Sequence, residues 1–116
     1  MKTTNPQLID TIRLLRNASK ENNSRIWAAL ADELEHSKQR RTAVNLSRIS
    51  RTSKKGETVA VPGKVIGSGS SDDRTVAAFA FSQTARIKIQ KSGGECLSFA
   101  KLIEKYPKGS GVRIIV

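Results

Sequence analysis

Apolar residues recur at helical spacing near the start of the chain. Leu8, Ile12 and Leu15 follow one another at intervals of four and three residues, which places them on one face of a helix. Pro6 suits the first turn of this helix, and we expect the helix to end near Asn22. A second apolar stripe predicts another helix from about residue 24, with Ile26, Trp27, Leu30, Ala31 and Leu34 on one side. The short connection between the two helices predicts an αα-hairpin.

In the second half of the chain, short β-prone runs replace the helical spacing. Residues 58–61 predict a strand that ends at Pro62 and Gly63, and residues 64–66 predict a second short strand. The polar, glycine-rich stretch 67–73 predicts a tight turn between strands. Gly67, Gly63 and Gly69 are therefore expected to shape turns.

The apolar run 75–81 is long enough to predict a buried strand, with Phe79 in the core. Ser82 can cap a helix that continues through Lys91 and ends before two glycines. Three shorter elements follow: a strand at 95–98, a helix at 99–105 and a strand at 112–116. The predicted fold class is α/β, a compact body of short strands and helices in irregular β-β-α turns, preceded by the αα-hairpin and a basic segment.

A length of 116 residues suits a single domain. Within residues 1–116 we expect a helical hairpin at 1–37, a basic segment at 38–56 and an α/β body at 57–116. No run of 18 or more apolar residues occurs, and the N-terminus lacks the apolar stretch of a signal peptide, so we expect a cytoplasmic protein.

Positive charge dominates the chain. It has 21 Lys and Arg against 10 Asp and Glu, a formal net charge of +11. Residues 38–55 contain seven of the basic residues and no acid. These positive charges repel one another, so we expect an anionic partner to neutralise them. Arginine suits phosphate oxygens, whereas Val44, Leu46 and Ile49 make only a ragged face for a membrane surface. Nucleic acid is the favoured partner, and without it we expect residues 38–56 to be weakly buried and mobile.

Catalytic, cofactor and metal sites find little support. Gly67-Ser68-Gly69 begins a dinucleotide-binding pattern, but Asp72 occupies the place of its third glycine. His36, the single histidine, is predicted at a helix end, and Cys96, the single cysteine, is predicted as a small core residue. One cysteine and one distant histidine cannot build a four-ligand zinc site. We therefore expect no enzyme activity, no cofactor and no metal.

Several strings in the sequence together resemble a known family. They are Val-Asn-Leu-Ser-Arg-Ile at 44–49, Val-Pro-Gly-Lys-Val-Ile-Gly-Ser-Gly at 61–69, Ala-Ala-Phe-Ala-Phe-Ser at 77–82, and Gly-Gly at 93–94. The chain resembles, over nearly its whole length, the archaeal and eukaryotic large-subunit ribosomal protein eighteen-e family, which is related in fold to bacterial large-subunit ribosomal protein fifteen. The compact length is similar to that of archaeal members. The resemblance implies a stoichiometric subunit of the large ribosomal particle that binds its RNA directly and supports translation.

The family's basic motif matches at Asn45 and Arg48, and its Pro-Gly-Lys turn matches at Lys64, which implies that these positions face RNA. The candidate phosphate contacts are Lys38, Arg40, Arg41, Asn45, Arg48, Arg51, Lys54, Lys55 and Lys64. Weaker candidates are Arg25, Arg86, Lys88 and Lys91. Because folded ribosomal RNA is largely A-form, we expect recognition of shape and backbone.

The expected partners are large-subunit ribosomal RNA and neighbouring ribosomal proteins, with no membrane and no homo-oligomer. The alternative function is that of a free-standing basic DNA-binding or chromatin-like protein. It would need a duplex-reading helix or a dimer seam, and the sequence shows neither heptads nor a clear recognition helix.

Overall fold

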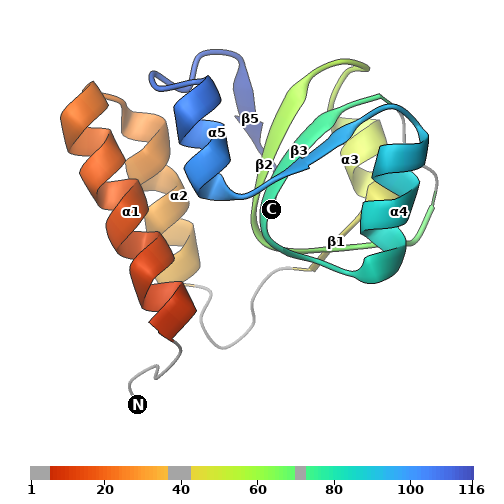
Figure 1. Cartoon of the computed structure of the whole chain (residues 1–116), viewed down its shortest axis with the longest axis horizontal. Coiled ribbons are helices and arrows are strands. Elements are labelled where there is room, and N and C mark those ends of the chain that lie inside the picture. The colour runs from red at the N-terminus through yellow and green to blue at the C-terminus, as the bar shows by residue number, and fades with distance from the viewer. Residues whose placement is uncertain (1–5, 37–42, 70–72) are drawn as a thin grey trace.

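The computed structural model describes residues 6–36, 43–69 and 73–116 of the chain. Within these ranges five helices and five strands occur. They are α1 (Pro6–Asn22), α2 (Arg25–His36), β1 (Ala43–Asn45), α3 (Leu46–Thr52), β2 (Thr58–Ile66), β3 (Thr75–Phe81), α4 (Gln83–Lys91), β4 (Glu95–Leu97), α5 (Phe99–Lys105) and β5 (Val112–Ile114). The α/β class and the N-terminal helix pair predicted from the sequence are confirmed (Figure 1).

The five strands form one sheet in which every recorded pairing is parallel. The order is β1-β2-β3-β4, and β5 pairs with the first residues of β2 while β1 pairs with its last residues. The helices α1, α2 and α5 cover one face of this sheet, and α3 and α4 cover the other (Figure 1). The molecule therefore has three layers, with the sheet in the middle.

Two expectations about the centre of the chain are wrong. Residues 58–66 form one continuous strand. Pro62 and Gly63 do not end it, because the register against β3 shifts between Val61 and Lys64, as at a β-bulge, and the pairing continues beyond them. The glycine-rich stretch is no tight turn, since β2 and β3 are parallel and Thr58 lies opposite Thr75. The chain must travel back along the strand between Ile66 and Thr75, so this stretch belongs to a crossover connection.

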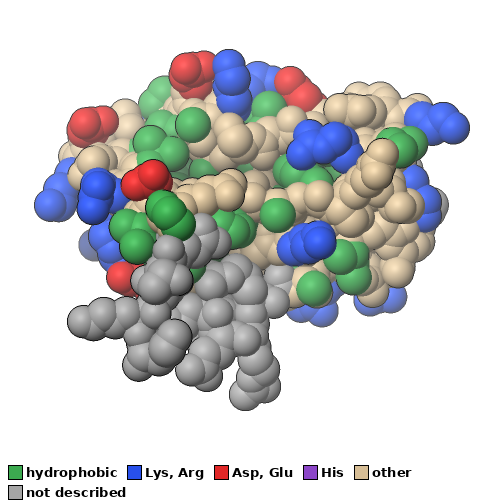
Figure 2. All heavy atoms as spheres, turned by 60° about the horizontal axis from the view of Figure 1, so that its bottom comes forward, with side chains coloured by type: hydrophobic (Ala, Val, Ile, Leu, Met, Phe, Trp, Pro, Cys, Tyr) green, Lys and Arg blue, Asp and Glu red, His purple; other side chains and the backbone are tan. Residues whose placement is uncertain are grey.

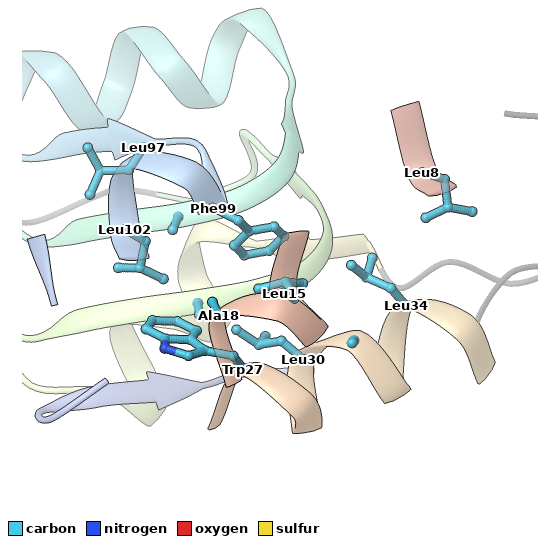
Figure 3. Packing of buried hydrophobic residues seen from close by; sticks show 12 residues of the cluster. Leu8, Leu15, Ala18, Trp27, Leu30, Leu34, Leu97, Phe99 and Leu102 are labelled. Atoms are coloured by element: carbon cyan, nitrogen blue, oxygen red, sulfur yellow. The ribbon is translucent and has the colours of Figure 1, made fainter. Parts of the chain in front are cut away.

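One hydrophobic core lies between the sheet and the layer of α1, α2 and α5. Leu15, Trp27, Leu30 and Leu34 have no exposed surface, as their apolar stripes predict. Figure 3 shows side chains from the hairpin, β4 and α5 meeting in this core. Full burial of a large aromatic side chain stabilises a domain by about 1.5–3 kcal/mol, so Trp27 is a main contributor here.

The loop between α5 and β5 ties the helical hairpin to the sheet. The indole Nε1–H of Trp27 donates a hydrogen bond to the carbonyl oxygen of Pro107 at 2.8 Å. The hydroxyl of Ser24, in the turn between α1 and α2, donates to the carbonyl oxygen of Lys108 at 2.8 Å. Gly109 follows with a φ of +73°, in the left-handed region that favours glycine. The hairpin is therefore held by polar contacts at its turn as well as by its apolar face.

A second hydrophobic core lies between the sheet and the layer of α3 and α4. Val44, Leu46 and Ile49 are each no more than 2% exposed within it. The expectation of weak burial is therefore wrong for Val44, Leu46 and Ile49, because these three apolar side chains dock on the sheet. The expectation also covered residues 38–42, which lie outside the described part of the chain.

The strand β3 is less deeply buried than its apolar sequence predicts. Val76, Ala77 and Ala78 are buried, but Phe79 and Phe81 keep part of their surface exposed. Phe79 packs against the first core as predicted, but its side chain is only partly buried. Both residues line surface hollows.

Candidate nucleic-acid interface

The two helical layers differ sharply in charge. The helices α1, α2 and α5 together contain six Lys or Arg and six Asp or Glu, whereas α3 and α4 contain five Lys or Arg and no acid. Figure 2 shows the same division: acidic side chains lie over the hairpin end and along the top, and the charged side chains visible at the α3–α4 end are basic. The surplus charge of the described chain therefore belongs largely to one face of the sheet.

Acids pair with three of the six cations on α1, α2 and α5, namely Arg16, Lys101 and Lys105. Arg16 of α1 donates to Asp32 of α2 at 2.9 Å and contacts Glu35 as well. Both carboxylates raise the pKa of Arg16 by accepting its hydrogen bonds, and Glu95 raises the pKa of Lys105 in the same way. Such exposed pairs stabilise folding little, but they leave this layer without a strong net field.

Helix α3 presents two arginines to solvent because its other face is anchored. Leu46 and Ile49 point into the second core, which turns Arg48 and Arg51 outward. The two arginines are three residues apart and therefore lie on neighbouring positions of the helix surface. Neither forms an ion pair with any described residue. Their guanidinium groups are available to phosphate oxygens.

A buried arginine, which the sequence analysis missed, holds the end of α3. Arg74 is 4% exposed, and its Nε donates to the hydroxyl of Ser53 at 2.8 Å. Its Nη2 donates to the carbonyl oxygen of Ser53 at 2.9 Å and lies 3.4 Å from that of Ser50. A cation at a helix C-terminus satisfies carbonyls that have no helical partner and meets the negative end of the dipole. Its position just before an apolar strand is the only local sign of this function.

The exposed Lys54 and Lys55 follow α3 in a loop that is fixed at its end. The backbone N–H of Lys54 donates to the carboxylate of Glu57 at 2.8 Å, and this bond is the main reason that the pKa of Glu57 is lowered. Arg113 donates to the same carboxylate at 3.2 Å and lowers the pKa further. Glu57 is therefore the acidic residue at the end of a loop that also contains Lys54 and Lys55.

Residues 67–69 of the glycine-rich crossover pack between α3 and α4. Lys88 of α4 donates from its Nζ to the carbonyl oxygens of Gly67 at 2.6 Å and Gly69 at 2.9 Å. The backbone N–H of Ser47, in the first turn of α3, donates to the carbonyl oxygen of Ser68 at 3.2 Å. Lys88, a weaker candidate for phosphate binding, thus already positions this loop, and Gly67 and Gly69 permit its close approach.

Lys64 and Asn45 do not share the face of α3. Val44 and Val65 are opposite one another in β1 and β2, and both pack into the second core. Because side chains alternate along a strand, Lys64 and Asn45 leave the sheet on the opposite face. Arg48 and Arg51 therefore lie on the α3 side of the sheet, Lys54 and Lys55 are exposed in the loop that follows α3, and Lys64 is exposed on the other face. Three further candidates lie outside the described residues: Lys38, Arg40 and Arg41.

The remaining weaker candidates divide between the two layers. Arg25 lies at the start of α2, in the neutral layer, and Lys91 is exposed at the end of α4. Arg86 is also on α4, and its guanidinium carbon lies 5.0 Å from the centre of the Phe81 ring.

Other candidate groups show no catalytic arrangement among the described residues. His36 is the last residue of α2, and Cys96 is half-buried beside the second core, where desolvation raises the pKa of its thiol. In the described ranges no three potential metal-ligating side chains come together. Nor is any described helix both long and apolar enough to cross a bilayer.

Residues 1–116 match the family described as "Ribosomal protein 60S L18 and 50S L18e". The chain belongs to this family. Large ribosomal subunit protein eL18 of Methanothermobacter thermautotrophicus is 50% identical over 113 residues, which cover 97% of this chain and 93% of the relative. The same protein of Methanoregula boonei is 46% identical over 116 residues, covering 99% and 96%. That of Archaeoglobus fulgidus is 40% identical over 117 positions, covering 100% of both.

Membership makes the chain a structural constituent of the large ribosomal subunit and not an enzyme. The family resemblance drawn from residues 44–49, 61–69 and 77–82 is confirmed, as is its archaeal character. The alternative of a free-standing DNA-binding or chromatin-like protein is not favoured.

Proposed function

We propose that the chain binds folded ribosomal RNA of the large subunit through the basic surface of α3 and the loop after it. Arg48, Arg51, Lys54 and Lys55 are its phosphate contacts, and Lys64 and Asn45 make a second contact on the opposite face of the sheet. The sequence adds three more residues to this proposal, Lys38, Arg40 and Arg41. The single observation that carries it is the contrast between a neutral layer and a layer with five basic side chains and no acid.

Burial and hydrogen bonding support a preformed surface. Leu46 and Ile49 anchor α3 from below, and Arg74 anchors its C-terminal end. A surface that is already ordered loses little conformational entropy on binding, and it suits recognition of A-form shape and backbone. We expect RNA at the basic side and at Lys64, neighbouring ribosomal proteins on other surfaces, and no second copy of the chain.

The test uses two variants that remove the same number of charges from the two layers. One replaces Arg48, Arg51 and Lys55 with Gln, and the other replaces Arg13, Lys20 and Arg25 with Gln. All six side chains are exposed. Affinity for a large-subunit RNA transcript is measured at several salt concentrations. The unsubstituted chain should lose several decades of affinity between low and moderate salt, because about six to ten neutralised phosphates release counterions.

The α3 variant should bind at least about 100-fold more weakly, since charge-assisted hydrogen bonds contribute about 1.5–3 kcal/mol each. The salt slope, which is the slope of the logarithm of the binding constant against the logarithm of the salt concentration, should fall in magnitude by about one for each phosphate that the variant no longer neutralises. The hairpin variant should change both quantities much less, and thermal melting should show that both variants are folded. Equal reductions in the two variants would mean that RNA responds to net charge alone, and a flat salt dependence would exclude a phosphate-binding surface.

A further inference from the structure

A hollow of about 210 Å³ opens at the edge of the sheet, beyond the end of β4. β4 pairs with β3 only over Thr75–Ala77, and the next residues of the two strands separate. The hollow is lined by residues 78–81 of β3, residues 96–98 and Arg86 of α4. Its volume is below the roughly 300–1,000 Å³ of small-molecule sites, so it suits a single flat group.

The wall of the hollow on the α4 side is a stacked pair. The guanidinium carbon of Arg86 lies 5.0 Å from the ring centre of Phe81, within the range of a cation–π contact. The Ser82 hydroxyl accepts a hydrogen bond from the backbone N–H of Ala85 and so fixes the first turn of the helix that carries Arg86. The pair is therefore held from both elements, yet Arg86 remains exposed.

The rest of the lining is apolar or small. Ala78, Phe79 and Ala80 line it from β3, and Phe79 is half-buried against the first core. Arg86 is the one charged side chain among the lining residues, and α4 carries three cations without an acid. Aromatic rings and guanidinium planes beside a basic surface are the means by which proteins hold unstacked bases of RNA.

We propose that this hollow takes up one unpaired nucleotide of RNA, with its base against the Arg86–Phe81 pair and its phosphate attracted by α4. The proposal rests on the proposed function, since it adds a base-stacking contact to a phosphate-binding protein. It differs in chemistry from the α3 surface, which contacts backbone oxygens. The α3 surface accepts duplex RNA, whereas the hollow requires a base that has left the helical stack.

The test compares two RNA probes with the whole chain: a ten-nucleotide oligoadenylate and a ten-base-pair RNA duplex. Arg86→Lys keeps the charge but removes the planar group that stacks. It should weaken binding of the oligoadenylate by about tenfold, leave duplex binding unchanged, and keep the salt slope. Phe81→Leu should have the same selective effect, and its thermal melting shows whether the chain remains folded.

Lys91→Gln on the same helix is the matched control. It removes a charge without a stacking partner, so it should lower the salt slope for both probes and leave their affinity ratio unchanged. An unchanged ratio in both Arg86→Lys and Phe81→Leu would overturn the proposal while leaving the proposed function intact. Failure of the unsubstituted chain to bind any RNA would instead overturn the proposed function, and the stacking site with it.

Cys96 offers an independent measurement, because it is the single cysteine of the chain and lines the hollow. A photo-crosslinking group is attached to its thiol at alkaline pH, since burial raises the pKa of Cys96. The labelled chain is then built into a reconstituted large subunit and irradiated. An adduct with ribosomal RNA is the expected result, and an adduct with a ribosomal protein would show that a protein segment occupies the hollow and would overturn the proposal.

Discussion

The two helical layers cover the same sheet by different means. The layer of α1, α2 and α5 packs large apolar side chains, balances its charges and hydrogen-bonds its turn to the loop around Lys108. The helices α3 and α4 contain only basic charged residues, and this layer depends on hydrogen bonds that Arg74 and Lys88 donate to backbone carbonyls. A layer that stabilises the fold can thus be neutral. A layer that binds a polyanion must instead be held by its buried side, so that its exposed cations remain available to the partner.

The largest expected effect is on the neutral layer. Trp27→Ala should lower the free energy of unfolding by about 3–5 kcal/mol, because the side chain is fully buried and its N–H is hydrogen-bonded. Phe79→Ala is the comparison: its partly exposed ring should cost clearly less. Denaturant unfolding measures both. Equal destabilisation would contradict the burial difference between the two aromatic residues.

Gly69 and Gly93 have nearly the same backbone conformation but different surroundings, so their substitutions can be compared directly. Gly69 has a φ of +90° and Gly93 a φ of +88°, but a Cβ at Gly69 would lie 2.8 Å from that of Ser47, whereas the space around Gly93 is open. Gly93→Ala should cost about 1 kcal/mol of stability from backbone strain alone. Gly69→Ala should cost more and also weaken RNA binding, since it pushes the loop away from α3.

The measurements are thermal melting and RNA affinity at fixed salt. Gly93→Ala serves as the control for strain without displacement. A decrease of RNA affinity in Gly93→Ala as large as that in Gly69→Ala would refute the idea that the loop positions α3.

Hydrogen exchange tests the anchoring of α3 directly. We expect the amides of α3 to be protected in the free protein, because Leu46 and Ile49 are buried. Arg74→Met should destabilise the protein by about 1–3 kcal/mol, since it leaves the buried carbonyl of Ser53 without its donor. Exchange should accelerate in α3 and remain slow in α1. Fast exchange of α3 in the unsubstituted protein would restore the expectation of a mobile segment.

The smallest effect concerns pH. Hydrogen bonds from Lys54 and Arg113 lower the pKa of Glu57 in the folded state below its ordinary value of 4.5. The stabilisation they give is therefore complete above that value and is lost as the pH falls through the lower, folded-state pKa. Glu57→Gln should remove this part of the acid dependence of stability, and Glu104→Gln, which removes an exposed carboxylate of α5, is the charge-matched control. Thermal melting between neutral and acid pH measures the difference, and identical acid profiles for the unsubstituted chain and Glu57→Gln would contradict it.

Local pattern was enough to place most elements. The apolar spacing of Leu8, Ile12 and Leu15 predicted α1, and a capping serine followed by a glycine pair predicted α4. The strings around Asn45 and Lys64 led to the family, and the eighteen residues without an acid marked a basic surface. These signals are readable because helix periodicity, capping and charge runs depend on residues within a few positions of one another.

Tertiary structure decided how those elements meet. Nothing local shows that β2 and β3 are parallel, that Lys64 faces away from α3, or that Val44 pairs with Val65. Arg74 looks like one more surface cation, and only packing places it under Ser53, 21 positions earlier in the chain. The physical reason is that sheet register and burial depend on contacts between residues far apart in sequence, whereas periodicity, capping and charge counts depend on neighbours.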